Sequence, residues 1–203
     1  MSQHKHIKNN NCFFYTMPKV LIGFTGNIGA GKTTAANFIC NCFGFQHYNF
    51  ADPIKKFALS VGFDEKNVNG CVAEKNAVNG RMGISGREFM RKFGTEICRD
   101  VLPKVMPTMG NIWIKAFDKA FIRCEKKGMV VGDVRFLDEA AAIKKNGGIV
   151  IRIERKSTDN NVSTHTSDTT LRQIEEDYTV ENDGALSELQ TKIMKIIVCH
   201  FFI

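Results

Sequence analysis

The sequence has no apolar run that approaches the roughly 20 residues a membrane-spanning helix needs. Its N-terminus also lacks the apolar centre of a secretory signal peptide. We therefore expect a cytoplasmic protein with no membrane partner.

Metal-binding cysteine patterns are missing as well. The sequence has no CxxC pair and no Cys/His spacing of a zinc site, which argues against a structural metal. Its seven cysteines are odd in number and scattered, and most fall on apolar helical faces. This favours reduced thiols that pack inside an intracellular protein. The cysteines are Cys12, Cys40, Cys42, Cys71, Cys98, Cys124 and Cys199.

Composition sets the size of the domain but does not select a ligand. A chain of 203 residues can form one large α/β domain and is too short for two comfortable ones. Lys and Arg number 28 against 21 Asp and Glu, a net charge of +7. This excess suits either a nucleic-acid surface or a cleft that holds several phosphates.

A glycine-rich segment follows the first apolar run of the chain. Residues 20–24 are apolar and β-rich, and Gly26 is followed after four residues by Gly31-Lys32-Thr33. This spacing is that of a P-loop, which needs a buried strand before it and a helix after it. Residues 34–43 have the periodicity of that helix. The residues predicted to surround the phosphates are Gly26, Asn27, Ile28, Gly29, Ala30, Gly31, Lys32, Thr33 and Thr34.

Each part of this segment has a chemical reason. Glycines let the backbone turn sharply and point its N–H groups into a concave nest that fits phosphates. Lys32 adds an ammonium group that can follow the β and γ phosphates, and the Thr33 hydroxyl can bind Mg²⁺. A helix that begins near Lys32 presents its positive end to the same phosphates.

The rest of the chain alternates between strand and helix patterns. Residues 1–16 are polar and without periodicity, so we expect a disordered extension before a single domain over residues 17–203. Residues 61–86 are rich in glycine and asparagine, which predicts a flexible loop on the substrate side. The other predicted elements are strands at 45–50, 129–135, 149–153 and 178–180, and helices at 52–58, 85–99, 111–127, 136–145 and 186–197.

Asp52 and Lys55 lie at the start of a predicted helix. Asp52 is placed as its N-cap, with Pro53 in the first turn, and a good cap alone would explain the acid. Alternatively, Asp52 and Lys55 lie at the carboxyl edge of a parallel sheet, where α/β folds bind their ligands.

The predicted helix at 85–99 has an apolar and a basic face. Phe89, Phe93 and Ile97 share the apolar face, while Arg87 and Arg91 lie four residues apart on the other. The basic face is either a solvated stripe, or Arg87 holds the phosphate of a second substrate through a two-pronged contact.

Three further residues have more than one interpretation. Trp113 is either a core residue or a platform for base stacking. Asp133 and Arg135 end a strand that is apolar on both faces, and an acid there, near a P-loop, is a candidate second ligand of Mg²⁺. Asp133 could instead cap the next helix, although the adjacent Arg135 favours a charged catalytic edge.

The segment after residue 153 is polar. Because it is short of apolar residues, we expect a mobile lid at about 154–172. Asn182-Asp183-Gly184 then predicts a turn before the closing helix.

In their order and spacing, these motifs resemble the deoxynucleoside monophosphate kinases of tailed phages and large DNA viruses. That family lies within the wider group of nucleoside monophosphate and dephospho-CoA kinases. The likeness covers residues 18–203. It rests on residues 26–34, 51–55, 87, 94–96, 113–115, 133–135, 151–155 and 182–184.

The resemblance implies an α/β fold of three layers, with a five-stranded parallel sheet and helices on both faces. It implies an ATP site at the P-loop, with the turn of Asn182, Asp183 and Gly184 near the adenine. A substrate-side insertion at about 52–110 would face the acceptor. The implied acceptor site comprises Ile54, Lys55, Arg87 and Arg135, and Asp52 and Trp113 are further candidates by position.

The expected reaction is reversible phosphoryl transfer from ATP with Mg²⁺ to a deoxynucleoside monophosphate, which supplies nucleotides for DNA synthesis. Lys32 and Arg135, with Arg152 and Arg155 of the lid, would supply positive charge. Thr33 and Asp133 would coordinate the metal. The acceptor is an ionised phosphate, so no strong general base is needed.

The expected partners are small nucleotides, with no stable nucleic-acid complex, and the chain is expected to be a monomer or homodimer. If a virus encodes it, the compartment would be the host cytoplasm.

Two alternatives stay open. A dephospho-CoA kinase phosphorylates a hydroxyl and would need a base such as Asp52. An ATP-driven nucleic-acid-binding protein would usually carry Asp-Glu where this chain has Asp133-Val134. A GTPase would need an Asn-Lys-x-Asp segment, which is absent. The preferred base is not readable from the sequence.

Overall fold

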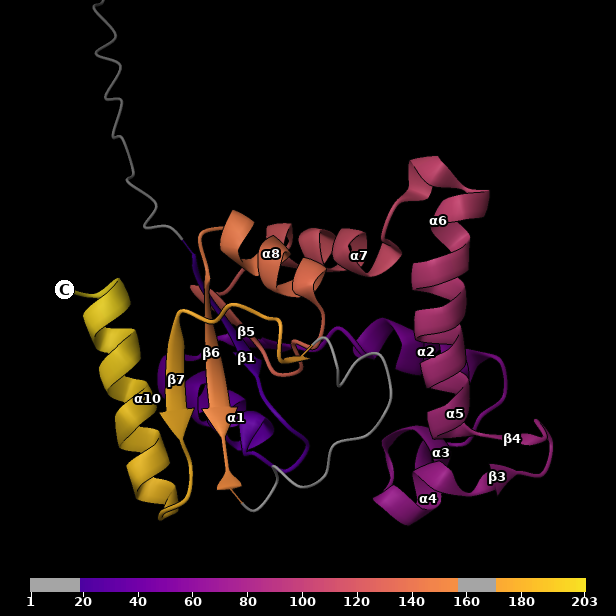
Figure 1. The fold of residues 1–203 in the computed structure, drawn as a ribbon, viewed down its shortest axis with the longest axis horizontal. Coiled ribbons are helices and arrows are strands. Elements are labelled where there is room, and N and C mark those ends of the chain that lie inside the picture. Colours follow the sequence, from indigo (N-terminus) through magenta and orange to yellow (C-terminus); the bar gives the residue numbers. More distant parts are fainter. Residues whose placement is uncertain (1–18, 157–170) are drawn as a thin grey trace, which may run out of the picture.

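The computed structural model describes residues 19–156 and 171–203 (Figure 1). The extension predicted at 1–16 and most of the predicted lid lie outside these residues. Among the described residues, no helix has both the length and the apolar character needed to cross a membrane.

The centre of the molecule is a five-stranded sheet in the order β2-β5-β1-β6-β7, and every neighbouring pair is parallel. All six residues of the central strand β1 are buried. Such a strand reads as a continuous apolar run because both faces of the sheet are covered. The strands are β1 (Val20–Thr25), β2 (Gln46–Tyr48), β5 (Gly128–Val131), β6 (Ile149–Glu154) and β7 (Tyr178–Glu181).

Helices cover both faces of this sheet, as the sequence predicts. α1 (Lys32–Phe43) and α10 (Leu186–Phe201) pack on one face, where their buried side chains join the core of β1 and β6. α7 (Ile112–Ile122) and α8 (Leu137–Lys145) pack on the other (Figure 1). The fold is therefore the expected α/β arrangement of three layers.

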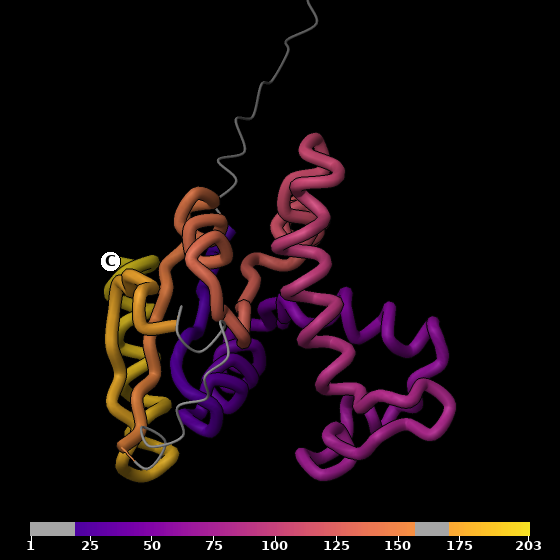
Figure 2. The backbone as a smooth tube through the Cα atoms, turned by 45° about the vertical axis from the view of Figure 1, so that its right-hand side comes forward, coloured from indigo at the N-terminus to yellow at the C-terminus, as the bar shows by residue number. Residues whose placement is uncertain are grey.

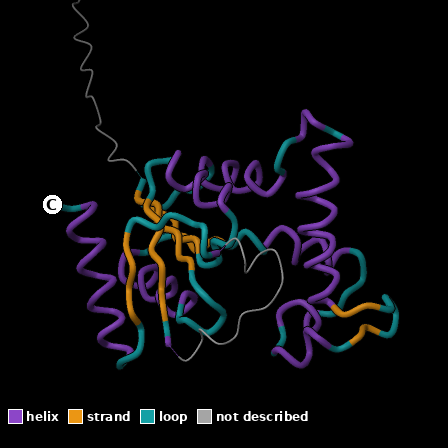
Figure 3. Tube along the Cα trace, viewed as in Figure 1, coloured by secondary structure: helices purple, strands orange, loops and turns teal. Residues whose placement is uncertain are grey.

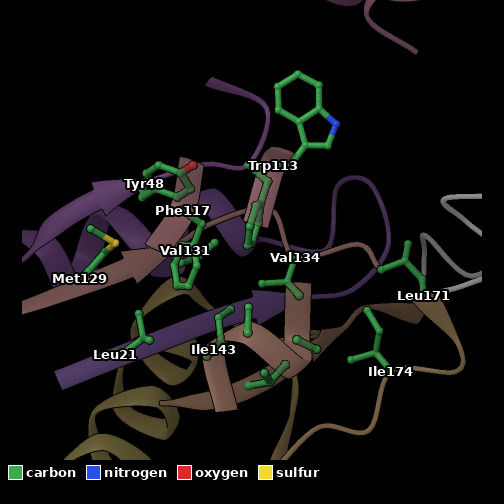
Figure 4. Close-up of a cluster of buried hydrophobic side chains, with 14 of the residues drawn as sticks. Leu21, Tyr48, Trp113, Phe117, Met129, Val131, Val134, Ile143, Leu171 and Ile174 are labelled. Carbon is green, nitrogen blue, oxygen red and sulfur yellow. The ribbon is translucent and has the colours of Figure 1, made fainter. Parts of the chain in front are cut away.

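The core between the sheet and α7 is aromatic on one side and aliphatic on the other. Phe117 of α7 lies against Tyr48 of β2, with ring centroids 5.7 Å apart, while Ile143 of α8 packs near Leu21 and Val131 (Figure 4). Burial of such side chains contributes about 1.5 to 3 kcal/mol each. This core holds the carboxyl ends of the strands in fixed positions.

An insertion between β2 and β5 stands beside the sheet (Figures 2 and 3). Four phenylalanines hold it together: Phe57, Phe63, Phe89 and Phe93 stack in pairs with centroids 4.7 to 6.2 Å apart. Its elements are α2 (Asp52–Ser60), α3 (Glu65–Asn69), α4 (Val72–Asn76), β3 (Val78–Asn79), β4 (Ile84–Ser85), α5 (Gly86–Arg91), the π-helix η1 (Lys92–Val101), α6 (Leu102–Val105) and the 3₁₀ turn η2 (Pro107–Met109).

The prediction of an irregular, flexible loop at 61–86 is wrong. This segment forms α3, α4 and the antiparallel pair β3-β4. The Asn79 side-chain amide donates to Asn67 Oδ1 at 2.8 Å and to Asp64 Oδ2 at 3.1 Å, and both asparagines are buried. Asparagine here crosslinks the chain by side-chain hydrogen bonds instead of marking a loop.

The helix predicted at 85–99 exists but has a different phase. Ser85 caps it, accepting the N–H of Glu88 at 3.2 Å, and α5, η1 and α6 run without a break to Val105. The π-helix pairs residue i with i+5, so its turn is wider than that of an α-helix. Ile97, predicted to share the apolar face of Phe89 and Phe93, is 47% exposed for this reason.

The described cysteines form no disulfide, and three of them match the packing prediction: two are buried, and Cys40 is partly buried against the core. Cys98 and Cys124 are buried, and burial raises the pKa of the Cys98 thiol. Cys42, Cys71 and Cys199 are exposed, so packing does not explain these three.

Candidate active site

The predicted P-loop connects β1 to α1 and can only be built with glycine at its two ends. Gly26 has φ 133°, and a Cβ there would lie 2.2 Å from the carbonyl oxygen of Ile153. Gly31 has φ 107°, and a Cβ there would lie 2.6 Å from the side-chain amide of Asn182. The loop thus takes a conformation that other residues resist, as a phosphate nest requires.

The Lys32 ammonium lies over this loop. It donates to the carbonyl oxygens of Gly26 and Asn27, each at 2.7 Å. Thr33 and Thr34 follow in the first turn of α1 and are exposed. The geometry places a cation and two hydroxyls at the positive end of a helix, next to the glycine nest.

The turn after β7 contacts the P-loop directly. The Asn182 side chain donates to the carbonyl oxygen of Ala30 at 2.8 Å, while Asp183 Oδ1 accepts the N–H of Lys156 at 2.9 Å. That hydrogen bond lowers the pKa of Asp183. Nearness of this turn to an adenine stays a prediction. Its observed contacts join the P-loop to the chain that follows β6.

Asn182 offers a test of that contact. In Asn182→Ala the Ala30 carbonyl loses its donor, which costs about 1 to 3 kcal/mol if the group stays buried. We expect the KM for ATP to rise about tenfold in steady-state kinetics, and the KM for the acceptor to stay unchanged. Asn146→Ala is the control, because Asn146 donates in the same way to the Ala142 carbonyl on α8. Equal effects of the two variants would contradict a role at the P-loop.

Asp133 joins two strands at the carboxyl edge of the sheet. Its carboxylate accepts the N–H of Phe50 at 2.7 Å and of Ala51 at 3.0 Å, in the chain that follows β2. Burial raises the pKa of Asp133, and Arg135 and the two N–H donors oppose that rise. β5 ends at Val131, so the acid stands just past the strand.

Asp133 does not cap the next helix, which was the alternative interpretation. Glu139 does so: its Oε2 accepts the N–H of Arg135 at 2.8 Å and of Phe136 at 3.2 Å. Burial raises the pKa of Glu139, and the Arg99 guanidinium opposes this rise by stabilising the carboxylate. Sequence reasoning missed Glu139 and Arg99. The sequence signal for Glu139 is a glutamate three residues after the N-cap, Phe136.

The N-cap assignment of Asp52 is wrong. Ala51 stands at the N-cap position, and Asp52 is the first residue of α2. The Asp52 carboxylate accepts the backbone N–H of Asn49 at 3.1 Å, three residues before it. Lys55 Nζ lies 4.0 Å from Asp52 Oδ1, and both side chains are about one-third exposed. The pair lies beside Asp133, since Phe50 and Ala51 bind that acid.

The other acceptor candidates divide by burial. Arg87 and Arg135 are exposed, whereas Ile54 is buried in the core. Trp113 is 8% exposed, and its indole N–H donates to the carbonyl oxygen of Gly94 at 2.9 Å. This leaves little ring surface on which a base could stack, so the contacts favour the core interpretation of Trp113.

The two arginines at the start of the predicted lid differ. Arg152 is held by the chain before β7: its guanidinium donates to the carbonyl oxygens of Leu171 and Ile174 and to Glu176 at 2.8 to 3.1 Å. These contacts favour an anchoring role. Arg155 is exposed. Contact of either arginine with a phosphoryl group stays a prediction.

The donor set fits a magnesium ion held mainly by nucleotide phosphates. The described residues include no group of three or more His, Cys, Asp or Glu side chains that could hold a metal by themselves. Mg²⁺ in phosphoryl-transfer sites needs only one or two protein oxygens beside phosphates and water. The exposed Thr33 hydroxyl and the Asp133 carboxylate, both past the carboxyl ends of strands, match that need.

A separate cavity of about 250 Å³ lies in the insertion, beside the β3-β4 pair. Its lining includes Asp64, Asn67, Asn79 and Arg81, and none of the predicted site residues. The asparagines there are already paired with each other. The cavity therefore adds nothing to the P-loop site.

A parallel sheet with a glycine nest after its central strand, and a lysine and threonine at the helix that follows, defines a P-loop protein that binds nucleoside triphosphates. The family model of deoxynucleotide monophosphate kinases matches residues 74–193. A putative deoxynucleotide monophosphate kinase of Acanthamoeba polyphaga mimivirus is 33% identical over 186 residues, covering 88% of this chain and 96% of the relative. The chain belongs to the deoxynucleotide monophosphate kinase family.

A more distant relative and a solved structure are also similar to this chain. The deoxynucleotide monophosphate kinase of Escherichia phage RB69 is 26% identical over 144 residues, which is 69% of this chain and 56% of the relative. The crystal structure of TT1252 from Thermus thermophilus has a TM-score of 0.50 and 17% identity, covering 90% of this chain and 98% of that chain. It supports the fold alone. Membership in the family makes the chain a nucleotide kinase, and favours neither the dephospho-CoA kinase nor the nucleic-acid-binding alternative.

Proposed function

We propose that the protein transfers the γ-phosphoryl group of ATP to a deoxynucleoside monophosphate, giving the diphosphate and ADP. The observation that carries this is the glycine nest between β1 and α1 with the Lys32 ammonium inside it, in a chain of this family. Phosphoryl transfer needs positioning and charge neutralisation more than covalent chemistry, and this edge of the sheet supplies both.

The donor would bind at the nest. Backbone N–H groups of residues 26–34 and the Lys32 ammonium would hold the phosphates, and the Asn182 amide keeps the loop in shape through Ala30. When ATP binds, Lys32 exchanges the carbonyls of Gly26 and Asn27 for phosphate oxygens. These are charge-assisted contacts, and they strengthen as negative charge moves toward the leaving oxygen.

The acceptor would bind between the nest and the insertion. Lys55 and Asp52 of α2, Arg87 of α5 and Arg135 beyond β5 would supply the charges on that side, with Ile54 behind them. An arginine binds a phosphate by two parallel hydrogen bonds and fixes its direction. Arg155, and Arg152 if it leaves its present partners, would add charge near the transferred group.

Mg²⁺, when bound, neutralises charge on the β and γ phosphates. Thr33 and Asp133 would hold it. Asp133 also keeps the Phe50–Ala51 backbone in place through its two hydrogen bonds. The acceptor oxygen belongs to an ionised phosphate, so no side chain has to remove a proton.

An acceptor panel tests this function. The four common deoxynucleoside monophosphates, their ribonucleotide counterparts and dephospho-CoA are each incubated with ATP and Mg²⁺, and the diphosphates are separated by ion-exchange chromatography. We expect deoxynucleoside diphosphates to form and dephospho-CoA to stay unchanged. The panel also gives the base preference. Phosphorylation of dephospho-CoA alone would replace the proposal with its rival.

Arg87 provides the test of the acceptor site. If its guanidinium holds the acceptor phosphate, Arg87→Ala loses a contact of roughly 1.5 to 3 kcal/mol. We expect the KM for the acceptor to rise about ten- to a hundredfold, with the KM for ATP nearly constant. Arg123→Ala, which removes an exposed arginine at the end of α7, is the control. No change, or equal weakening toward both substrates, would remove Arg87 from the site.

Partners and compartment follow from this reaction. We propose that the partners are small nucleotides in the cytoplasm, without a stable nucleic-acid complex, and that the protein is a monomer or homodimer. Light scattering of the purified protein, with and without single-stranded DNA, measures the oligomeric state and the binding of nucleic acid. An increase in mass on adding DNA would contradict the proposal that no stable nucleic-acid complex forms.

A further inference from the structure

A cluster of four polar side chains joins the insertion to α8. Arg99 of η1 donates from Nη1 to both carboxylate oxygens of Asp138, each at 2.8 Å, and its Nη2 forms a second ion pair with Glu139. Asn111, at the start of α7, donates to Asp138 as well. We call Arg99, Asn111, Asp138 and Glu139 the Arg99 cluster. The Arg99 and Glu139 side chains are 10% and 3% exposed, so water screens this pair little.

The cluster reaches the backbone of Arg135. One carboxylate oxygen of Glu139 binds Arg99, while the other accepts the N–H groups of Arg135 and Phe136. The Arg99 guanidinium also lies over the Phe136 ring, 3.8 Å from its centroid. Arg99 therefore fixes the residue next to Arg135 from two sides, through Glu139 and through the ring.

Arg99 and Arg87 belong to one unbroken helical segment, residues 86–105. Arg135 belongs to the loop between β5 and α8. Two arginines that grip one phosphate must hold their distance, and here they come from separate parts of the fold. The Arg99 cluster provides a buried polar contact between those two parts.

We propose that Arg99 and Glu139 are positioning residues for acceptor binding. They hold Arg135 at a fixed position relative to Arg87. This rests on the proposed function. Neither residue touches the acceptor. They act through the main chain of Arg135, which they tie to the helical segment that carries Arg87.

A purely structural ion pair would behave differently. Its loss would lower the melting temperature and reduce the folded fraction, and both substrates would be affected alike. A positioning pair is expected to change acceptor binding alone, because Glu139 holds the backbone of Arg135 and Phe136 on the acceptor side. The ratio of the two KM values separates the cases.

Arg99→Lys is the main variant. Lysine keeps the charge that Glu139 needs, so the fold is preserved, but it has one nitrogen where Arg99 uses two, Nη1 for Asp138 and Nη2 for Glu139, and it cannot lie flat on the Phe136 ring. Misplacement of a substrate-holding group by a fraction of an ångström to 1 Å costs about tenfold or more. We expect the acceptor KM to rise about tenfold, with the ATP KM unchanged. Lys92→Ala is the control, since Lys92 pairs with Glu88 at 3.0 Å on the exposed surface of the same segment.

A double-mutant cycle makes the assignment specific. If Arg99 acts through Arg135, then Arg99→Lys added to Arg135→Ala should change the acceptor KM by less than about twofold, because the group it positions is gone. If the acceptor KM of the double variant instead rises by the product of the two single effects, Arg99 and Arg135 act independently and the proposal is overturned.

Each remaining outcome decides the question. An acceptor KM in Arg99→Lys that matches Lys92→Ala, or a parallel rise for both substrates, overturns the inference while leaving the proposed function intact. A wild-type protein that phosphorylates no deoxynucleoside monophosphate overturns the proposed function and this inference with it. Arg99→Ala, if folded, should exceed Arg99→Lys in its effect on the acceptor alone.

Discussion

Replacement of Lys32 by alanine will lower kcat at least about a hundredfold and leave the protein folded. The ammonium lies inside the glycine nest, 2.7 Å from each of two carbonyl oxygens, and it is the only side-chain cation among residues 26–34. A preorganised cation that meets charge developing on a phosphate contributes several kcal/mol to the transition state. Single-turnover assays with saturating ATP measure this loss apart from weaker binding.

Stability should change little in this variant. Lys32 bonds to the carbonyls of an open loop, and such contacts contribute about 1 kcal/mol or less. Lys195→Ala, which removes an exposed lysine from α10, is the matched control and should keep full activity. Near-normal turnover by folded Lys32→Ala would end the kinase proposal.

Asp133→Asn is expected to have the second large effect. The carboxylate accepts two N–H groups and is the proposed protein ligand of Mg²⁺. An asparagine has one acceptor oxygen and turns an NH₂ group toward a donor, so one N–H loses its partner at a cost of about 1 to 3 kcal/mol. Without the negative charge, metal binding weakens. We expect kcat to fall about a hundredfold or more and the Mg²⁺ concentration for half-maximal rate to rise.

Asp177→Asn separates the metal role from the structural one. Asp177 Oδ2 accepts the N–H of Val150 at 2.8 Å, at the opposite, amino end of β6. Its replacement removes a similar hydrogen bond away from the P-loop. We expect a lower melting temperature in both variants but a lower kcat and altered Mg²⁺ dependence only in Asp133→Asn. Equal kinetics of the two would contradict a metal role for Asp133.

The sheet and the P-loop could be predicted because their signals are local. The apolar run that became β1, the glycines of the turn and the amphipathic helix after it each fit within about a dozen residues. β1 is buried on both faces, so its pattern carries no ambiguity about which side faces the core. The family resemblance added the number of strands, which short segments such as β2 do not reveal.

The insertion could not be predicted in the same way, because its structure depends on contacts across the chain. Asn79 is typical of a loop by sequence, and only the fold brings it within hydrogen-bond distance of Asn67 and Asp64. The π-helix η1 changes which side chains share a face, and the α-helical spacing of apolar residues in the sequence does not predict that change. Ile97 was placed on the wrong face as a result.

The site residues also differ in whether their signal is local or depends on contacts across the chain. Lys32 and Asp133 were found from short motifs, and the structure brings both to the carboxyl edge of the sheet. The pairing of Glu139 with Arg99, 40 residues away, could only come from the fold. The partners of Arg152 also come from the fold, because they lie 19 to 24 residues away along the chain, and its contact with a phosphoryl group stays a prediction.

The central claim is that the γ-phosphoryl group of ATP moves to the phosphate of a deoxynucleoside monophosphate. ATP labelled at the γ position, incubated with the protein, Mg²⁺ and each deoxynucleoside monophosphate, tests it directly when the products are separated by thin-layer chromatography. We predict that label appears in a deoxynucleoside diphosphate, in equal amount to the ADP formed, and that Lys32→Ala abolishes it. Label found only in inorganic phosphate, or left entirely in ATP with every acceptor, would contradict the account.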